Sequence, residues 1–478
     1  SLFTLPSSLF PLPSSLSPLP SPLSTRLSMN RYYADLHIHS RYSRATSPQC
    51  TPEGLHHWAQ IKGVGVCGTG DCTHPQWLAE LQAKLIEDAP GLYALRPELL
   101  PAADEGVPES CRRPARFMVT GEISSIYKRA GRVRKVHSLI LLPSLDAAAK
   151  LNRRLDQIGN IRSDGRPILG LDPRDLLEIM LETDPLAALI PAHIWTPWFS
   201  MLGAKSGFDS LDECFGALSR HIFAVETGLS SDVPMNRRVR CLDRLALVSN
   251  SDLHSPANLG RNANLFFGEP SYHSIINGLR SRDPSVCGGT VDLFPEEGKY
   301  HLDGHRACKT RLTPEQSMAL GNICPVCGKE VTIGVLHRVV ELERMQKAEI
   351  RGRKSEVRDQ RAEVRGNIST TLELPNFRTS ELPPRLPYRY IIPLPELLAQ
   401  QLDVGTASKK VRAAYLSLLS AKGSELPFLL DTPAIDLENM GVIGQAVLAV
   451  RQGRVERVGG YDGEYGRVMP ISHQPPSG

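Results

Sequence analysis

The feature that most constrains the fold is a series of short apolar runs that each end in residues of the kind that bind metal ions. The first run ends in DLHIH at 35–39. His37 and His39 would point to the same side of a strand there, because side chains alternate across a strand with a period of two. Four later runs end similarly, at 66–71 with His74, 119–122, 190–193 and 248–254. Five strand ends that carry His, Asp and Glu predict one shared metal site.

The alternation of strand-like and helix-like segments predicts an α/β fold. Strand-like segments lie at 33–38, 64–68, 116–122, 136–142, 167–171, 188–194, 222–226 and 245–249. Helix-like segments lie between several of them, at 52–61, 75–87, 145–157 and 173–182. This pattern favours a distorted (β/α)7 barrel, in which chemistry gathers at the C-terminal rim of the strands. An open doubly wound sheet is the alternative, but no Gly-rich phosphate loop follows the first strand.

Length and composition limit the remaining classes. A chain of 478 residues is too long for one ordinary core, so two domains with additions are expected. The formal charge of +4 is too small to indicate nucleic acid by itself. Ten cysteines without a regular framework favour a reducing, cytoplasmic location. No run of eighteen apolar residues occurs, so no membrane span and no membrane partner are predicted.

Composition shifts suggest five segments. Residues 1–28 repeat Leu, Pro and Ser and are predicted to be a low-complexity disordered extension before Met29; prolines interrupt any signal-peptide core. The barrel is expected over 29–295, a zinc-finger-like module over 296–340, a charged linker or insertion over 341–385, and a small helical DNA-binding region over 386–478. The linker holds a seven-residue repeat at 354–367 with one Val per repeat, too few for a coiled-coil seam. Contact of its basic residues with phosphates is a minor alternative.

A second metal site is predicted within 296–340. His305-x2-Cys308 is followed, after fifteen residues, by Cys324-x2-Cys327, a spacing typical of one structural zinc ion. His301 or His337 could replace His305 as the fourth ligand. A group of free cysteines is the ordinary alternative.

The barrel inventory is typical of phosphodiester hydrolysis. Such hydrolysis uses several cations a few ångströms apart, with a carboxylate that bridges two of them. The candidate ligands are His37, His39, Asp71, His74, Glu122, His137, His193, Asp252 and His254. We expect two to three divalent ions, with zinc, manganese or iron fitting the mixed imidazole and carboxylate ligands better than magnesium. A single histidine among these would more commonly be a hydrogen-bonded core residue, but nine together favour a site.

These motifs resemble the polymerase-and-histidinol-phosphatase (PHP) superfamily. The resemblance implies one metal held by His37, His39, Glu122 and Asp252, and a second held by Glu122, His137 and His193. A third would use Asp71, His254 and His74. Family members often have a histidine shortly after His-x-His, whereas 40–46 contains none, and Cys72 stands where others have histidine. Weak or transient occupancy of the third position would follow.

A closer resemblance is to the endonuclease Q family. It rests on 34–46, 68–75, 193–200, 205–210, 226–232 and 249–256, and more weakly on 460–466. The resemblance implies a DNA repair endonuclease that cuts the strand 5′ of a deaminated base (uracil, hypoxanthine or xanthine) or of an abasic site. Asp252, Glu122 and His193 would be its catalytic residues. Its partners would be double-stranded DNA with a damaged base and a sliding clamp or repair helicase, in a nucleoid-associated location.

Several residues could contact DNA, each with an ordinary alternative. Trp195, Trp198 and Phe199 follow His193 and could form the wall of a base pocket, or pack beneath the rim. Basic residues near the ligand-bearing strands could bind phosphates: Arg41, Arg44, Lys128, Arg129, Arg132, Arg134 and Lys135. A solvated charged hairpin explains 128–135 equally well. Lys409 and Lys410 open a helix after Gly405 in a composition suited to phosphate, or to a simple helix cap.

Two other functions are compatible with the same residues. A small-molecule phosphoesterase similar to histidinol phosphatase would need only the barrel. A DNA-binding protein with a catalytically weakened metal site would bind lesions without turnover.

Overall fold

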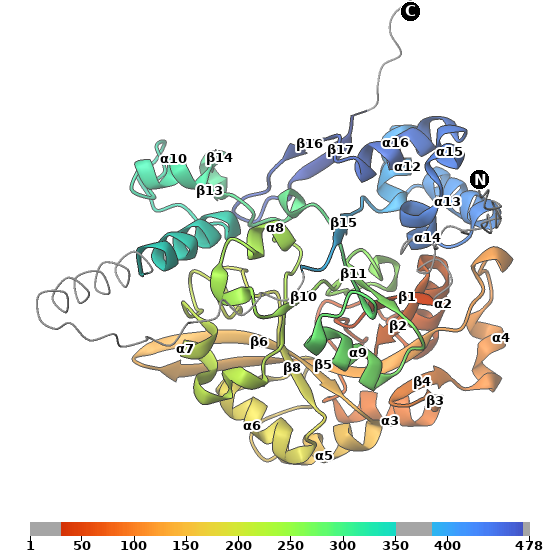
Figure 1. Ribbon diagram of the computed structural model, residues 1–478, viewed down its shortest axis with the longest axis horizontal. Coiled ribbons are helices and arrows are strands. Elements are labelled where there is room, and N and C mark those ends of the chain that lie inside the picture. The colour runs from red at the N-terminus through yellow and green to blue at the C-terminus, as the bar shows by residue number, and fades with distance from the viewer. Residues whose placement is uncertain (1–29, 350–384, 472–478) are drawn as a thin grey trace, which may run out of the picture.

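The computed structural model describes residues 30–349 and 385–471, and Figure 1 shows their arrangement. The chain is an α/β protein with a mixed sheet, which confirms the predicted fold class. The low-complexity run at 1–28 and the repeat at 354–367 lie outside the described residues.

Seven strands form the closed, distorted barrel. β1 (Arg31–Asp35), β2 (Val64–Gly68) and β5 (Arg116–Arg129) pair in parallel, and β6 (Arg132–Leu142) and β8 (Ala188–Pro191) follow in antiparallel register. β9 (Ala224–Glu226) and β10 (Ala246–Val248) form a parallel pair. The backbone N–H of Ile194 donates to the carbonyl of Glu226 at 3.1 Å, which joins β8 to β9. A parallel bridge between Ile38 and Leu253 joins the end of β10 to β1, so the ring closes.

The helices that cover the barrel begin at polar caps. α2 (Pro52–Lys62), α5 (Leu145–Leu155) and α6 (Pro173–Thr183) are capped by Thr51, Ser144 and Asp172, which accept from backbone N–H groups of the first turn. α3 (Pro75–Lys84) is three residues shorter than the predicted helix 75–87, because Leu85 begins an added strand. That strand, β3 (Leu85–Ala89), pairs with β4 (Leu92–Leu95), which pairs with β5.

The remaining elements of the barrel region are short or extend the sheet. β11 (Ala263–Phe267) pairs antiparallel with β1, and β12 (Cys287–Asp292) pairs antiparallel with β11. The others are α4 (Leu100–Ala103), β7 (Ile168–Leu169), α7 (Leu211–Phe215), α8 (Val233–Asn236) and α9 (Tyr272–Ser281).

A small module follows the barrel. It contains β13 (Asp303–His305), β14 (Thr310–Leu312) and α10 (Pro314–Ala319), around a separate core of Leu312, Cys324 and Val331. A helix over 335–349 then leads away from it, so the predicted boundary at residue 340 falls inside a helix.

The C-terminal region is helical but also continues the sheet. β15 (Tyr388–Tyr390) pairs in parallel with β12, and the β16 (Val455–Val458) and β17 (Arg467–Pro470) hairpin lies between the small module and the helices in Figure 1. The helices are α12 (Leu394–Leu402), α13 (Lys409–Lys422), α14 (Glu425–Asp431), α15 (Ala434–Glu438) and α16 (Gly441–Arg451).

Apolar side chains fill the barrel and the layer around it. Leu36, Val66, Met118, Leu139 and Ile190 are buried together inside the ring. Among the described residues, no helix has both the length and the apolar character needed to cross a membrane.

Candidate metal centre

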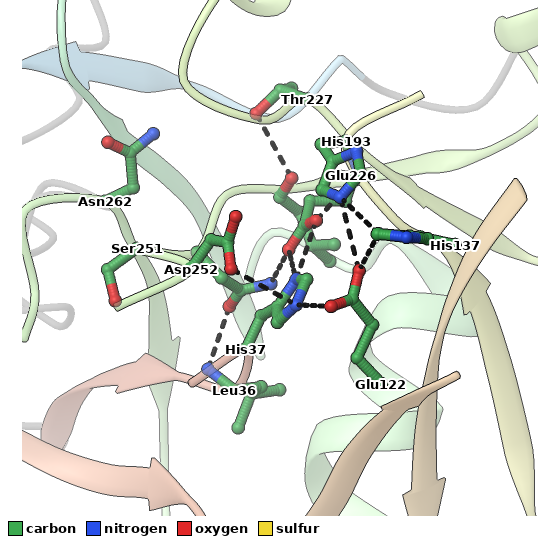
Figure 2. Close-up of polar contacts among 12 residues, drawn as sticks. Leu36, His37, Glu122, His137, His193, Glu226, Thr227, Ser251, Asp252 and Asn262 are labelled. Carbon is green, nitrogen blue, oxygen red and sulfur yellow. Dashed lines mark hydrogen bonds and ion pairs between the residues drawn. The ribbon is translucent and has the colours of Figure 1, made fainter. Parts of the chain in front are cut away.

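The predicted ligands converge at one end of the barrel. His37 and His39 follow β1, Glu122 lies within β5, His137 lies on β6, His193 follows β8, and Asp252 follows β10. In Figure 2 the carboxylate of Glu122 points between His37 and the pair formed by His137 and His193.

One group of ligand atoms combines two imidazoles and two carboxylates. One atom each from His37, His39, Glu122 and Asp252 lies within 4.8 Å of the others. His39 Nε2 is 3.1 Å from Asp252 Oδ1 and 3.3 Å from Glu122 Oε2, and His37 Nε2 is 3.5 Å from the same Glu122 oxygen.

A second group shares Glu122 with the first. Its other oxygen, Oε1, lies 2.6 Å from His137 Nδ1 and 3.2 Å from His193 Nε2. Glu122 is fully buried, and each of its two oxygens faces a different set of imidazoles. A carboxylate in this position can bridge two cations.

The donor set fits divalent metal ions. His37 Nε2 is buried and has no hydrogen-bond partner, although it points at two carboxylates. Burial lowers the pKa of His137 to about 4 in spite of the Glu122 charge, so its imidazole is neutral, as a metal ligand must be. Burial alone would raise the pKa of Glu122, but its contacts with His137, Arg166 and His37 outweigh burial and hold that pKa well below its usual range.

Two further carboxylates orient the histidines from behind. Glu226 accepts from His37 Nδ1 at 3.0 Å and from the backbone N–H of His193 at 2.8 Å. Asp71 lies 3.0 Å from His39 Nδ1. Such carboxylate partners fix which nitrogen of a histidine faces a metal. The role of Glu226 was not predicted, although it ends one of the strand-like segments and opens the stretch 226–232 that resembles endonuclease Q.

The predicted third set of ligands is not assembled. Asp71 is fully buried and its other oxygen accepts from the backbone N–H and hydroxyl of Ser40 and from the hydroxyl of Ser43, so it serves His39 instead. His74 caps α3, and its Nε2 is 3.0 Å from the carbonyl of Arg162. His254 lies nearer, with its ring centroid 4.6 Å from that of His39.

Arg166 enters the centre and was not predicted. Its Nη1 donates to Glu122 Oε2 at 3.0 Å, and its side chain is 27% exposed. The loop that carries it approaches closely, since a Cβ atom on Gly165 would lie 2.2 Å from Asp71 Oδ2. Only glycine fits at this position, which places the guanidinium of the next residue at the mouth of the site.

The backbone around the ligands is strained. His193, Asp252 and Asp71 have positive φ values of 27°, 47° and 47°. Positive φ is uncommon for residues other than glycine and costs on the order of 1–3 kcal/mol, and it concentrates at functional sites.

The three aromatic candidates differ in their surroundings. Trp195 is 1% exposed and its indole N–H donates to Asn236, so it packs in the core and cannot form a pocket wall. Phe199 packs on the ring of His137 at 4.9 Å, and Trp198 is 38% exposed. Arg338, from the helix over 335–349, donates to the carbonyls of Leu202 and Phe208 and so holds the loop that carries these rings.

The basic candidates are divided between internal and exposed positions. Arg129 and Arg134 donate to the carbonyls of Cys214 and Gly207, so they stabilise the fold rather than a solvated hairpin. Arg41 and Arg44 pair with Glu80 and Asp164, and the Arg44 side chain is 76% exposed. Lys409 and Lys410 are exposed in the first turn of α13, whose cap is Ser408. Lys128 and Arg132 are also exposed, and the Lys135 ammonium lies 5.0 Å from the centroid of the Phe199 ring.

The small module brings four zinc-type ligands together. One atom each from His305, Cys308, Cys324 and Cys327 lies within 4.8 Å of the others. His337 instead pairs with Asp303 at 2.5 Å, and His301 is not in the group. A hydrogen bond from Thr310 and nearby backbone N–H groups lower the pKa of Cys324 to about 6, which favours the thiolate that zinc binds.

We expect Cys324→Ser to remove one zinc ion per chain and to unfold the module. The core there consists of only three buried residues, so metal coordination would supply most of its folding free energy. Elemental analysis should find about one zinc fewer than in the wild type. Cys241→Ser, outside the cluster, is the control. An unchanged zinc content in both Cys324→Ser and Cys327→Ser would contradict the assignment.

Comparison with known proteins finds relatives that cover between 58% and 92% of the chain. No model of a protein family matches it. It is 28% identical over 285 residues to an uncharacterized protein of Methanocaldococcus jannaschii, covering 58% of this chain but only 31% of that longer protein. It is 26% identical to the uncharacterized protein YqxK of Bacillus subtilis, covering 92% of this chain and all of YqxK.

Two solved structures share the entire architecture. The lesion-specific endonuclease PfuEndoQ from Pyrococcus furiosus superposes with a TM-score of 0.72 at 28% identity, covering 92% of this chain and 95% of that one. Endonuclease Q in complex with a 27-mer duplex that carries an abasic lesion at the active site superposes with a TM-score of 0.71 at 28% identity, covering 92% and 97%. Because the likeness covers 92% of the chain at 28% identity, the chain shares the fold of endonuclease Q and is similar to that family through the barrel, the small module and the C-terminal region together.

Proposed function

We propose that this chain is a metal-dependent DNA repair endonuclease that nicks a strand 5′ of a deaminated base (uracil, hypoxanthine or xanthine) or of an abasic site. The observation that carries the proposal is the bridging position of Glu122 between two groups of metal-type ligands, within a fold shared with a lesion-specific endonuclease over 92% of the chain.

The residues of the barrel end have distinct roles in this proposal. His37, His39, Glu122 and Asp252 would hold one divalent cation, and Glu122, His137 and His193 a second. Bound cations of this kind activate water and neutralise phosphate oxygens during phosphodiester hydrolysis. Glu226 and Asp71 would keep His37 and His39 in the required orientation. The Arg166 guanidinium is placed to contact a phosphate at the mouth.

Features outside the barrel favour DNA over a small phosphate ester. A histidinol-phosphatase-like enzyme would need neither the zinc-type module nor the C-terminal helices, yet both are joined to the barrel by paired strands or side-chain contacts. The endonuclease Q structure that is matched over 97% of its length holds a duplex with an abasic lesion, which supports damaged duplex DNA as the partner. A sliding clamp or repair helicase, a nucleoid-associated cytoplasmic location and the identity of the metals stay predictions.

A nicking assay tests the proposed function. A labelled duplex with one uracil, hypoxanthine or abasic site, incubated with protein and Mn²⁺, Mg²⁺ or Zn²⁺, should yield one product cut on the 5′ side of the lesion. An undamaged duplex and histidinol phosphate are the matched controls. Intact lesion strands across all metals and pH values would refute the proposal, and lesion binding without cleavage would identify a weakened DNA-binding protein.

We expect Asp252→Asn to lower the nicking rate by about 10²-fold, or about 2.7 kcal/mol, and to leave lesion affinity within about twofold. Asparagine keeps the backbone, because like aspartate it tolerates the positive φ of 47° at this position. Only the charge of one ligand is lost. Single-turnover cleavage would measure the rate, and fluorescence anisotropy without added divalent ions would measure the lesion affinity. Full activity of the variant would refute the ligand assignment.

A further inference from the structure

A line of aromatic and basic side chains lies on the surface of the protein. We define the aromatic ridge as Trp198, Tyr300, Lys299 and Tyr465. Trp198 precedes Phe199 in the chain, and the ring of Phe199 contacts the candidate ligand His137. The ridge thus starts on the loop that carries Phe199 and ends in the hairpin loop between β16 and β17.

Consecutive members of the ridge contact one another although they come from three parts of the chain. The rings of Trp198 and Tyr300 are 5.9 Å apart between centroids, edge to face. The Lys299 ammonium lies 5.6 Å from the centroid of the Tyr300 ring and 5.9 Å from that of Tyr465. The lysine thus links two aromatic rings.

The ridge is exposed, yet its backbone is fixed. Tyr465 is 76% exposed, more than any other large hydrophobic or aromatic side chain of the described residues. Its loop is held by backbone hydrogen bonds from Gly463 to Lys299 at 2.9 Å and from Gly466 to Glu297 at 3.1 Å. A ring held in water on a fixed loop contributes nothing to the core and is ready to bind a partner without a large ordering cost.

The charge on the ridge favours an anionic partner. Lys299 forms no ion pair with any carboxylate of the described residues. Four acidic side chains belong to the same segments. Glu464 pairs with Arg306 at 2.7 Å and Glu296 pairs with Arg457 at 3.1 Å. Asp462 accepts hydrogen bonds from the backbone N–H of Arg306 and the hydroxyl of Thr332, and burial raises the pKa of Glu297 to about 8. Aromatic rings interleaved with an unpaired cation are typical of surfaces that bind unpaired nucleotides.

We propose that the aromatic ridge binds nucleotides that lose their pairing next to the lesion, with bases on the rings of Trp198 and Tyr465 and a phosphate on Lys299. The inference rests on the proposed function, because lifting a damaged base out of the duplex unpairs and unstacks its neighbours. Neighbouring members of the ridge lie 5.6 to 5.9 Å apart, whereas stacked bases along a strand lie roughly 3.4 Å apart. The ridge therefore suits an unstacked single strand better than an intact duplex. The ridge would hold the opened DNA while the centre acts on the backbone.

The test is a binding experiment with the structural zinc in place and no other divalent ion added, so that it does not depend on cleavage. A duplex with a tetrahydrofuran abasic site and 2-aminopurine opposite it is bound under these conditions by wild type, Tyr465→Ala, Tyr465→Phe and Lys299→Ala. In the wild-type complex, stacking on Tyr465 should quench the emission of 2-aminopurine. We expect Tyr465→Ala to weaken binding about tenfold and to leave this emission unquenched, because base–aromatic stacking is lost. Tyr465→Phe should behave as the wild type. Lys299→Ala should reduce the salt dependence of log Kd by about one phosphate contact.

Matched controls and opposing outcomes complete the design. Tyr388→Ala and Lys150→Ala remove an exposed tyrosine and an exposed lysine elsewhere and should change neither Kd nor emission. The proposal would be overturned if Tyr465→Ala bound the duplex and quenched 2-aminopurine as the wild type does. It would also be overturned if the substitution changed only the self-association of the protein, measured by sedimentation. A wild-type protein that binds this duplex through Tyr465 but never nicks it would overturn the proposed function alone.

Discussion

Glu122→Gln is expected to lower the nicking rate by about 10³-fold or more, a loss of about 4 kcal/mol of transition-state stabilisation. The reason is its position: Oε1 faces His137 and His193, whereas Oε2 faces His37 and His39. Glutamine has the same shape, but it carries no charge and offers an N–H group where one cation would bind. Both groups of ligands are weakened by one substitution, so the loss should exceed that of Asp252→Asn, which belongs to one group only.

The measurement should separate chemistry from binding. Titration with Mn²⁺ should show fewer or weaker sites per chain in Glu122→Gln. The affinity for an abasic duplex without added divalent ions should stay equal or rise, because a negative charge near the phosphate is removed. Glu182→Gln is the control, since that carboxylate is exposed on α6 and pairs with Arg154. Wild-type cleavage and wild-type Mn²⁺ binding by Glu122→Gln would show that this carboxylate does not bridge cations.

Periodicity made the centre of this site predictable. His37 and His39 lie two residues apart on extended backbone, so their common direction follows from strand geometry alone. The ends of strands that run side by side meet at one rim, which is why separate motifs at Glu122, His193 and Asp252 could be expected to converge. The closed barrel follows from the same alternation of elements.

Contacts that depend on loops could not be predicted in this way. Arg166 reaches Glu122 only because Gly165 allows its loop to touch Asp71, and nothing in the local sequence reports that approach. Trp195 was placed near the site by its closeness in sequence to His193. Sequence distance does not give direction, and the backbone turn at His193 sends this ring into the core.

The third metal position shows how one residue type serves two purposes. An aspartate at the end of a strand predicts a metal ligand, but the two oxygens of Asp71 bind His39, Ser40 and Ser43. The serines stand in the stretch where family members often have a histidine. The hydroxyls of Ser40 and Ser43 donate to one oxygen of Asp71, and the other oxygen orients the candidate ligand His39.

The attachment of the C-terminal region to the barrel depends on a buried ion pair, and breaking it should cost about 3–5 kcal/mol of stability. Lys62, at the end of α2, lies 2.6 Å from Glu425, at the start of α14, and the two side chains are only 5% and 3% exposed. Glu425 also accepts from the Tyr415 hydroxyl and from the backbone N–H of Leu394. Glu425→Ala would leave the ammonium buried without its counter-charge, so the free energy of unfolding in urea should fall by that amount.

The double variant Lys62→Met with Glu425→Gln removes both charges and keeps an acceptor for Leu394, so it should recover most of the loss. Glu182→Ala, which breaks the exposed pair with Arg154, should cost less than about 1 kcal/mol. A similarly small effect of Glu425→Ala would mean that apolar packing alone joins the helices to the barrel.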